Sequence, residues 1–168
     1  MKSDGSRPVL RIPLTRLEKY LEAASILGLI YAISSAVYAI TILPEIIPAQ
    51  YGINGKPDGW GSRNGVFLFP GVSVIIYLMF TILSRFPHIY KYPVKITKEN
   101  AGCQYLIGRH IIRWLKTEFI WVFAYVQTTF IKAAQSPNPR IGIAAPLIFI
   151  LAAYATTIWY MRKSTRNQ

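Results

Sequence analysis

Apolar and charged residues alternate in long blocks along this chain. Charged residues are missing from Ala23 to Pro44, from Asn64 to Ser84 and from Ile141 to Met161. Each of these stretches is long enough to supply the roughly 20 apolar residues with which a helix crosses a bilayer. They are apolar on all sides, whereas a helix of a soluble bundle normally keeps one polar face. The pattern predicts three membrane spans, at about 21–43, 65–84 and 142–161.

One more span, the third in chain order, is predicted at about 116–132, where aromatic and branched residues supply most of the side chains. Glu118 and Gln127 interrupt it. Because this segment is short, the lysines at its ends are expected to extend toward the lipid headgroups. The predicted fold class is therefore an all-α integral membrane protein, with four transmembrane helices in a bundle that forms a single domain from 21 to 161.

The distribution of basic residues predicts the orientation of these spans. The formal net charge of +12 would suggest nucleic acid as a partner of a soluble domain. In chain order, however, the five segments outside the spans hold 5, 2, 7, 2 and 3 basic residues. Since Lys and Arg are enriched in cytoplasmic segments, we predict a multi-pass protein of the cytoplasmic membrane. Its N-terminal segment 1–20 and its tail 162–168 lie inside, and no nucleic acid is required as a partner.

The residues that carry chemistry are divided between the two sides of the membrane. His88 and His110 are predicted on the cytoplasmic side, whereas Glu45 and Asp58 are predicted outside. A nucleophile with its base, or a metal with several ligands, needs residues that meet in one site. The single cysteine, Cys103, excludes an internal disulfide. We predict that the protein is not an enzyme and holds neither a metal nor a cofactor.

The loop between the first two spans is unusually rich in turn-forming residues. The pair Asn54-Gly55 favours a hairpin because both residues accept positive φ, and the proline-aspartate-glycine sequence that begins at Pro57 favours a second turn. Trp60 and Tyr51 combine an apolar body with a polar tip, which suits a membrane interface. We therefore expect a compact, structured loop at the outer surface.

This loop resembles a known family. The dipeptides LP at 43–44 and IP at 47–48, followed by PDGWGS at 57–62, are similar to the pattern "LPxxIPxHFNxxGxPDxWGS". That pattern belongs to a bacterial and archaeal membrane-protein family of largely unknown function, found at the N-terminal part of SdpI-type immunity proteins. The resemblance implies a multi-span protein whose namesake relatives protect a cell from a secreted peptide toxin and signal to a cytoplasmic repressor.

The chain departs from the family pattern at Gln50, where the family usually has histidine. Glutamine does not titrate near neutral pH and is a poor metal ligand. A proton-dependent or metal-dependent role of this position is therefore not expected here. The chain also has four predicted spans, where full SdpI-type proteins are expected to have more.

The leading hypothesis is that the first loop recognises an extracellular peptide, lipid or membrane partner, in toxin immunity or signalling with a cytoplasmic regulator. The candidate ligand-binding residues offer charge, hydrogen bonds and aromatic surface: Glu45, Gln50, Tyr51, Asn54, Asp58 and Trp60. The same side chains could instead cap two helices and keep the loop compact. Both interpretations stay open at the level of the sequence.

A second candidate surface precedes the third span. Arg109, Arg113 and Lys116 follow one another at spacings of four and three, which places them on one face of a helix. We expect an amphipathic lead-in that rests on the cytoplasmic leaflet and binds anionic lipid, with an acidic cytoplasmic partner as the alternative.

Transport is one alternative function. A carrier needs an ionisable group inside the membrane, and Glu22 and Glu118 are the candidates. Both lie near predicted cytoplasmic boundaries, so the simpler interpretation pairs them at the surface with Lys19 and Lys116, respectively.

A structural scaffold is the other alternative. A row of small residues recurs every four positions in the first span, which permits the close approach of another helix: Ala24, Gly28, Ala32 and Ala36. The alanine-rich fourth span is the expected neighbour, and a homo-oligomer through the same face is the alternative.

Overall fold

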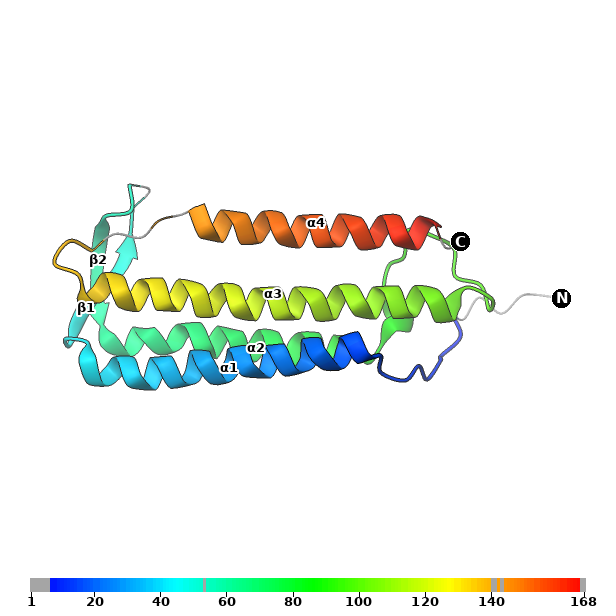
Figure 1. Cartoon of the computed structure of the whole chain (residues 1–168), viewed down its shortest axis with the longest axis horizontal. Helices are drawn as coiled ribbons and strands as arrows, with labels where there is room; N and C mark the ends of the chain where they lie inside the picture. The colour runs from blue at the N-terminus through cyan, green and yellow to red at the C-terminus, as the bar shows by residue number, and fades with distance from the viewer. Residues whose placement is uncertain (1–6, 53, 140–141, 143, 167–168) are drawn as a thin grey trace.

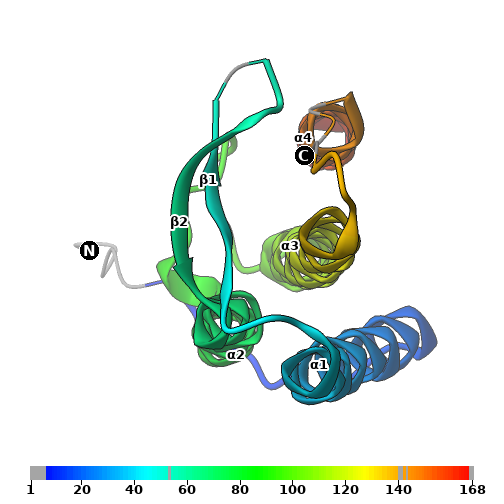
Figure 2. The same cartoon turned by 90° about the vertical axis from the view of Figure 1, so that its left-hand side faces the viewer.

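The computed structural model describes residues 7–52, 54–139, 142 and 144–166, and this part of the chain forms four α-helices and a β-hairpin. The helices are α1 (Arg16–Ile42), α2 (Leu68–Leu83), α3 (Ala101–Gln135) and α4 (Ala144–Arg166). They run side by side along the long axis of the molecule, and α3 lies between α4 and the pair formed by α1 and α2 (Figures 1 and 2). The outer parts of the predicted terminal segments, 1–6 and 167–168, lie outside the described residues, as do 53, 140–141 and 143.

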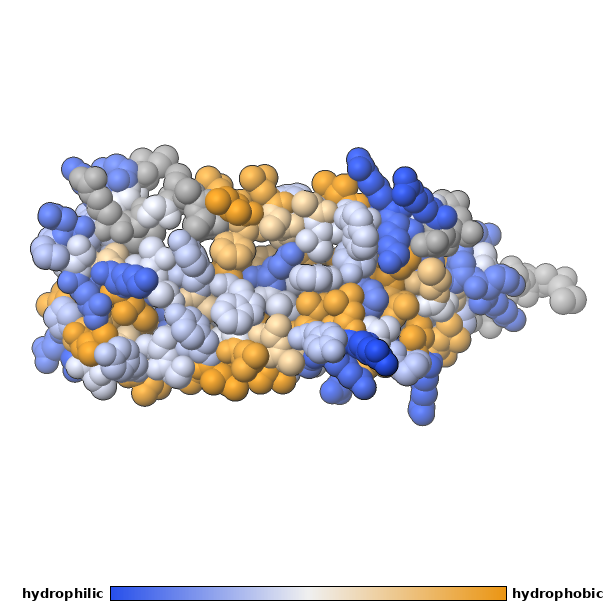
Figure 3. All heavy atoms as spheres, in the orientation of Figure 1, coloured by the Kyte–Doolittle hydropathy of each residue, from blue (hydrophilic) through white to orange (hydrophobic). Residues whose placement is uncertain are grey.

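Within the described residues, two helical segments are long and apolar enough to cross a membrane: Arg16–Ile42 and Arg63–Leu83. The second combines the 3-10 helix η1 (Arg63–Phe67) with α2. These two segments correspond to the predicted spans at 21–43 and 65–84. Apolar side chains cover much of the middle of the molecule, whereas the most hydrophilic residues gather mainly toward its two ends (Figure 3).

α1 begins at a capping box. The Oγ1 atom of Thr15 accepts a hydrogen bond from the backbone N–H of Glu18 at 3.2 Å, and Oε2 of Glu18 accepts one from the N–H of Thr15 at 2.8 Å. These bonds satisfy donors that a helix N-terminus otherwise leaves unpaired. The helix therefore starts at Arg16 rather than near 21, which places Glu18 and Glu22 one helical turn apart on α1.

The small-residue face of α1 packs against α3, and not against the alanine-rich fourth span as expected. A Cβ atom added at Gly28 would lie 2.8 Å from Cγ2 of Ile120. Ala32 is fully buried, and its carbonyl oxygen accepts a hydrogen bond from Nε2 of Gln127 at 2.8 Å. Gln127 interrupts the apolar pattern of the third predicted span. Its hydrogen bond to a backbone group of α1 links the two helices where small residues let their backbones approach closely.

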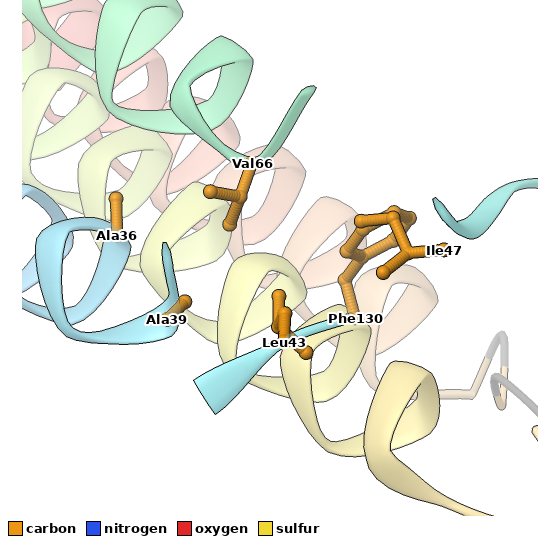
Figure 4. Packing of buried hydrophobic residues seen from close by; sticks show 6 residues of the cluster. All are labelled: Ala36, Ala39, Leu43, Ile47, Val66 and Phe130. Carbon is orange, nitrogen blue, oxygen red and sulfur yellow. The ribbon is translucent and has the colours of Figure 1, made fainter. Parts of the chain in front are cut away.

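The first loop folds as an antiparallel hairpin of β1 (Ile46–Tyr51) and β2 (Pro57–Ser62). Gly55 adopts a φ of 72° at the turn, a conformation that glycine reaches without steric cost. The side chain of Ile47 is 1% exposed and enters a cluster with Leu43, Val66 and Phe130, so it ties the hairpin to α1, η1 and α3 (Figure 4). The expectation of a compact loop that folds back on itself is confirmed.

The predicted amphipathic lead-in and third span form one continuous helix, α3. The connection from α2 contains the 3-10 helix η2 (Pro87–Ile89), after which the rings of Tyr90 and Tyr92 stack at a centroid distance of 6.0 Å. These two rings cover Gly108 on α3, where an added Cβ atom would lie 2.8 Å from the Tyr92 hydroxyl. The connection therefore packs tightly against the first half of α3.

Candidate functional site

The hairpin holds the six predicted ligand-binding residues, but they do not gather in one place. Glu45 and Trp60 line one open hollow of about 680 Å³ beside β2, together with Ile46 and Arg63. Trp60 is 64% exposed and Ile46 is 65% exposed. The hollow thus combines a carboxylate, a guanidinium and two large apolar side chains. The hairpin beside which it lies stands at the end of the bundle where α1 ends and α2 begins (Figure 1).

The other four predicted residues lie elsewhere on the hairpin. The ring of Tyr51 packs edge-on against Phe130 at 6.0 Å, and Oδ1 of Asn54 accepts a hydrogen bond from the N–H of Lys56 at 3.0 Å. Tyr51 therefore contributes to packing against α3, and Asn54 stabilises the turn of the hairpin. Gln50 and Asp58 are exposed on the strands and lie outside the hollow.

A charged cluster lies in the interior between α1 and α3. Glu18 is fully buried and accepts two hydrogen bonds from Arg109, from Nε to Oε1 at 2.8 Å and from Nη2 to Oε2 at 2.6 Å. Glu22 accepts hydrogen bonds from Nη1 of Arg113 at 2.9 Å and from Nζ of Lys116 at 2.7 Å. Three cations therefore meet two carboxylates inside the bundle.

The placement of these three cations differs from the sequence-based expectation. Arg109, Arg113 and Lys116 are 6%, 8% and 1% exposed, so this face does not rest on a lipid surface. The residues do share one helical face, as their spacing predicts, but that face meets Glu18 and Glu22. One sequence signal could have revealed this pairing. Glu18 and Glu22 are four residues apart, as are Arg109 and Arg113 on the partner helix, so the two pairs can face each other.

α2 completes the surroundings of Glu22. The hydroxyl of Tyr77 donates to Oε1 of Glu22 at 2.6 Å, and Nζ of Lys116 donates to Oγ1 of Thr81 at 3.1 Å. The same ammonium lies 4.5 Å from the centre of the Tyr77 ring, a favourable position for a cation. The predicted surface pairing of Glu22 with Lys19 is thus replaced by a network that joins α1, α2 and α3.

His110 borders this cluster on α3, before the predicted third span. Its Nε2 atom lies 3.2 Å from Oγ1 of Thr15, and its ring packs edge-on against Tyr160 of α4 at 6.0 Å. Burial lowers the pKa of His110 below its ordinary value, Glu18 raises it, and the nearby cations Lys163, Arg109 and Arg113 lower it further. The imidazole is therefore held mainly in its neutral form near neutral pH.

Glu118 points away from this network. Two positions after Lys116 on the same helix, it accepts a hydrogen bond from Oγ1 of Thr156 on α4 at 2.8 Å. The expected pair of Glu118 with Lys116 does not form because residues two apart on a helix face different directions. Glu118 thus belongs to the interface between α3 and α4.

Comparison with known proteins identifies a similarity in the first part of the chain. Residues 26–74 match a family described as a domain of unknown function (DUF1648), a segment that runs from α1 through the hairpin into α2. An uncharacterized protein of Archaeoglobus fulgidus is 28% identical over 157 residues, which cover 84% of this chain and 85% of that protein. No solved structure matches the chain. These similarities fit a membrane-protein family of unknown function, and the matched segment contains the whole hairpin.

Proposed function

We propose that the chain is a non-enzymatic protein with four membrane spans that recognises a peptide, lipid or membrane partner through the hollow beside β2. The main support for this proposal is a contrast in solvent exposure between side chains of the hairpin. Ile46 and Trp60 are largely exposed, whereas Ile47, the neighbour of Ile46, is buried in the core. The hairpin is therefore a fixed support that presents apolar side chains outward.

A fixed support favours recognition because little conformational entropy is lost when a partner binds. An indole exposed beside charged groups is typical of residues that contribute strongly to protein interfaces. Glu45 and Arg63 line the same hollow, so a partner that offers an apolar group flanked by polar or charged groups would complement it. A secreted peptide fits this description, in agreement with the toxin-immunity role that the family resemblance implies.

The proposed orientation places the hairpin outside the cell. The first loop, at the end of the bundle that carries the hairpin, has two basic residues, Lys56 and Arg63. The segment from Arg85 to Lys116, which comprises the connection at the other end and the first part of α3, has seven. The positive-inside rule then assigns the hairpin to the outer surface. Cys103, which is exposed near the start of α3, would face the cytoplasm and be available to a cytoplasmic regulator.

This orientation can be tested with a thiol reagent that does not cross membranes. In intact cells the reagent should leave Cys103 unmodified and should label a cysteine placed at Trp60 in a Cys103→Ser background. Inside-out vesicles should give the opposite pattern. Labelling of both positions from the same side would contradict the proposed orientation.

Recognition itself is tested by photocrosslinking in native membranes, with benzoylphenylalanine at Trp60. The matched control is the same group at Tyr38, which is 65% exposed on α1 and belongs to the first predicted span. A discrete adduct that forms from Trp60 and not from Tyr38 is the expected result, and its mass identifies the partner. If the Trp60 probe crosslinks only within its own chain, the hairpin is a structural cap and the proposal fails.

A further inference from the structure

The interface between α3 and α4 contains a cavity of about 310 Å³ that the proposed function does not use. Its walls are almost entirely apolar, with aromatic rings from Phe119 and Phe149 and a further ring from Tyr154. Among the described residues that line it, Glu118 is the one that carries a charge. Tyr154 and Ile150 are 67% and 51% exposed on α4, so the cavity opens toward the side of the bundle and not toward either end.

The carboxyl group of Glu118 is incompletely satisfied. Its Oε1 atom accepts the hydrogen bond from Thr156 at 2.8 Å, whereas Oε2 is buried and has no hydrogen-bond partner in the described part of the chain. The ion pairs formed by the described residues engage Glu18 and Glu22, and none reaches Glu118. A buried carboxylate without a counter-charge is unfavourable, so this group calls for a proton or an external cation.

We infer that this cavity binds an apolar organic cation, whose positive group pairs with Glu118 and whose apolar body fills the space between α3 and α4. Three aromatic rings in the walls suit a quaternary or tertiary ammonium because ring faces attract cations. The volume matches that of sites for small organic ligands. The entry route rests on the four membrane spans of the proposed function, in which the lateral opening faces the bilayer and an apolar cation enters from the lipid.

Other occupants match the cavity less well. A metal ion needs several oxygen ligands, whereas the described lining offers one carboxylate and the hydroxyls of Tyr154 and Thr157. A lipid acyl chain would fill the apolar space but offers no polar or charged group to the buried Oε2 atom of Glu118. Charge complementarity therefore favours the organic cation.

The test measures the binding of radiolabelled benzyltrimethylammonium to the purified protein in an uncharged detergent. The wild type should bind it saturably, and Glu118→Gln should weaken binding by about tenfold or more because the counter-charge is lost. The matched control is Glu99→Gln, which removes an exposed carboxylate on the connection before α3 and should leave binding unchanged. Equal binding by the wild type and Glu118→Gln would overturn the proposal.

Two further measurements keep the test decisive if Glu118→Gln folds poorly. Ala153→Leu adds a side chain to the wall of the cavity while it retains the carboxyl group, and it should weaken binding to a similar extent. With the wild type, unlabelled neopentylbenzene, the uncharged analogue of the same shape, should fail to displace the cation. Displacement by this neutral compound would show that the cavity is only an apolar groove, and unaltered binding by Ala153→Leu would place the bound cation elsewhere.

Discussion

Arg109 of α3 and Glu18 of α1 stand 91 positions apart in the chain and meet as a bidentate pair, with Nε–Oε1 and Nη2–Oε2 distances of 2.8 and 2.6 Å. Arg109 also donates to the carbonyl oxygens of Ile12 and Pro13, at 2.7 and 3.0 Å, and so holds the segment that leads into α1. Because Glu18 is at once part of the helix cap and the partner of Arg109, the start of α1 and its docking on α3 depend on the same carboxylate.

Arg109→Met should lower the free energy of unfolding by about 3 kcal/mol, because it leaves a buried carboxylate without its main partner. The expected loss lies at the lower end of the range for such pairs because Nε of Arg113 stays 3.5 Å from Oε1 of Glu18. Chemical unfolding in detergent micelles measures it. Arg11→Met, at an exposed position, is the control and should change stability by less than about 0.5 kcal/mol. Equal stabilities of the two variants would contradict a structural role for the pair.

The neutral state of His110 predicts a pH dependence of stability. Its pKa is lower in the folded state than its ordinary value of 6.5, so the unfolded chain takes up the proton first as the pH falls. Stability should therefore decrease as the pH falls below about 6.5, and this decrease should end once the folded state is protonated as well. Thermal unfolding of the wild type and of His110→Gln measures the effect, which the variant should lack in this range.

His88→Gln is the control for this experiment. It removes the other histidine of the chain and keeps the contacts of His110 with Thr15 and Tyr160. Its melting temperature should fall with pH in parallel with that of the wild type. If His88→Gln abolished the pH dependence and His110→Gln preserved it, the assignment to His110 would be wrong.

The elements of this fold could be predicted from the sequence more fully than the contacts between them. The Asn54-Gly55 pair and the glycines around it encode the turn of the hairpin locally, so the compact loop was predictable. Periodicity also placed Arg109 and Lys116 on one helical face, but it cannot tell whether a face meets lipid, water or another helix. The partner helix α1 supplied that information through Glu18.

The same limit explains the tertiary contacts that the sequence did not predict. Helix periodicity separates Lys116 from Glu118, which stand two positions apart, but it does not identify their partners. Only the placement of the other helices shows that Lys116 points toward α1 and α2 and that Glu118 points toward α4. Tyr51 was a candidate for ligand contact because of its residue type. Its packing against Phe130, 79 positions further along, depends on a tertiary contact that no local pattern contains.

Close approach of α1 and α3 predicts a marked sensitivity at Gly28. Gly28→Ala should lower the free energy of unfolding by about 1–3 kcal/mol, since the new Cβ atom would lie 2.8 Å from Ile120 and 3.3 Å from Trp121. Gly71→Ala is the matched control, because this helical glycine has nothing within 4 Å of the added atom. It should be neutral or stabilising by up to about 1 kcal/mol. Chemical unfolding of both variants decides whether α1 packs on α3 through this face.

The last prediction separates the anchor of the hairpin from its proposed recognition residue. Ile47→Ala removes a side chain that is 1% exposed and should cost about 2–5 kcal/mol, mostly by loosening the hairpin from the core. Hydrogen exchange of the β1 and β2 amides should then accelerate. Trp60→Ala, at a position that is 64% exposed, should leave this exchange unchanged and the stability within about 0.5 kcal/mol of the wild type.

These two variants also connect stability with function. If the hairpin recognises a partner, Trp60→Ala should abolish partner binding while the hairpin amides stay as protected from hydrogen exchange as in the wild type. Ile47→Ala should instead weaken binding because the hairpin is no longer held in place. Acceleration of hairpin exchange by Trp60→Ala to the level of Ile47→Ala would show that the indole serves packing. The exposed face of β2 would then be a structural cap over the ends of α1 and α3, and the recognition role would have to be abandoned.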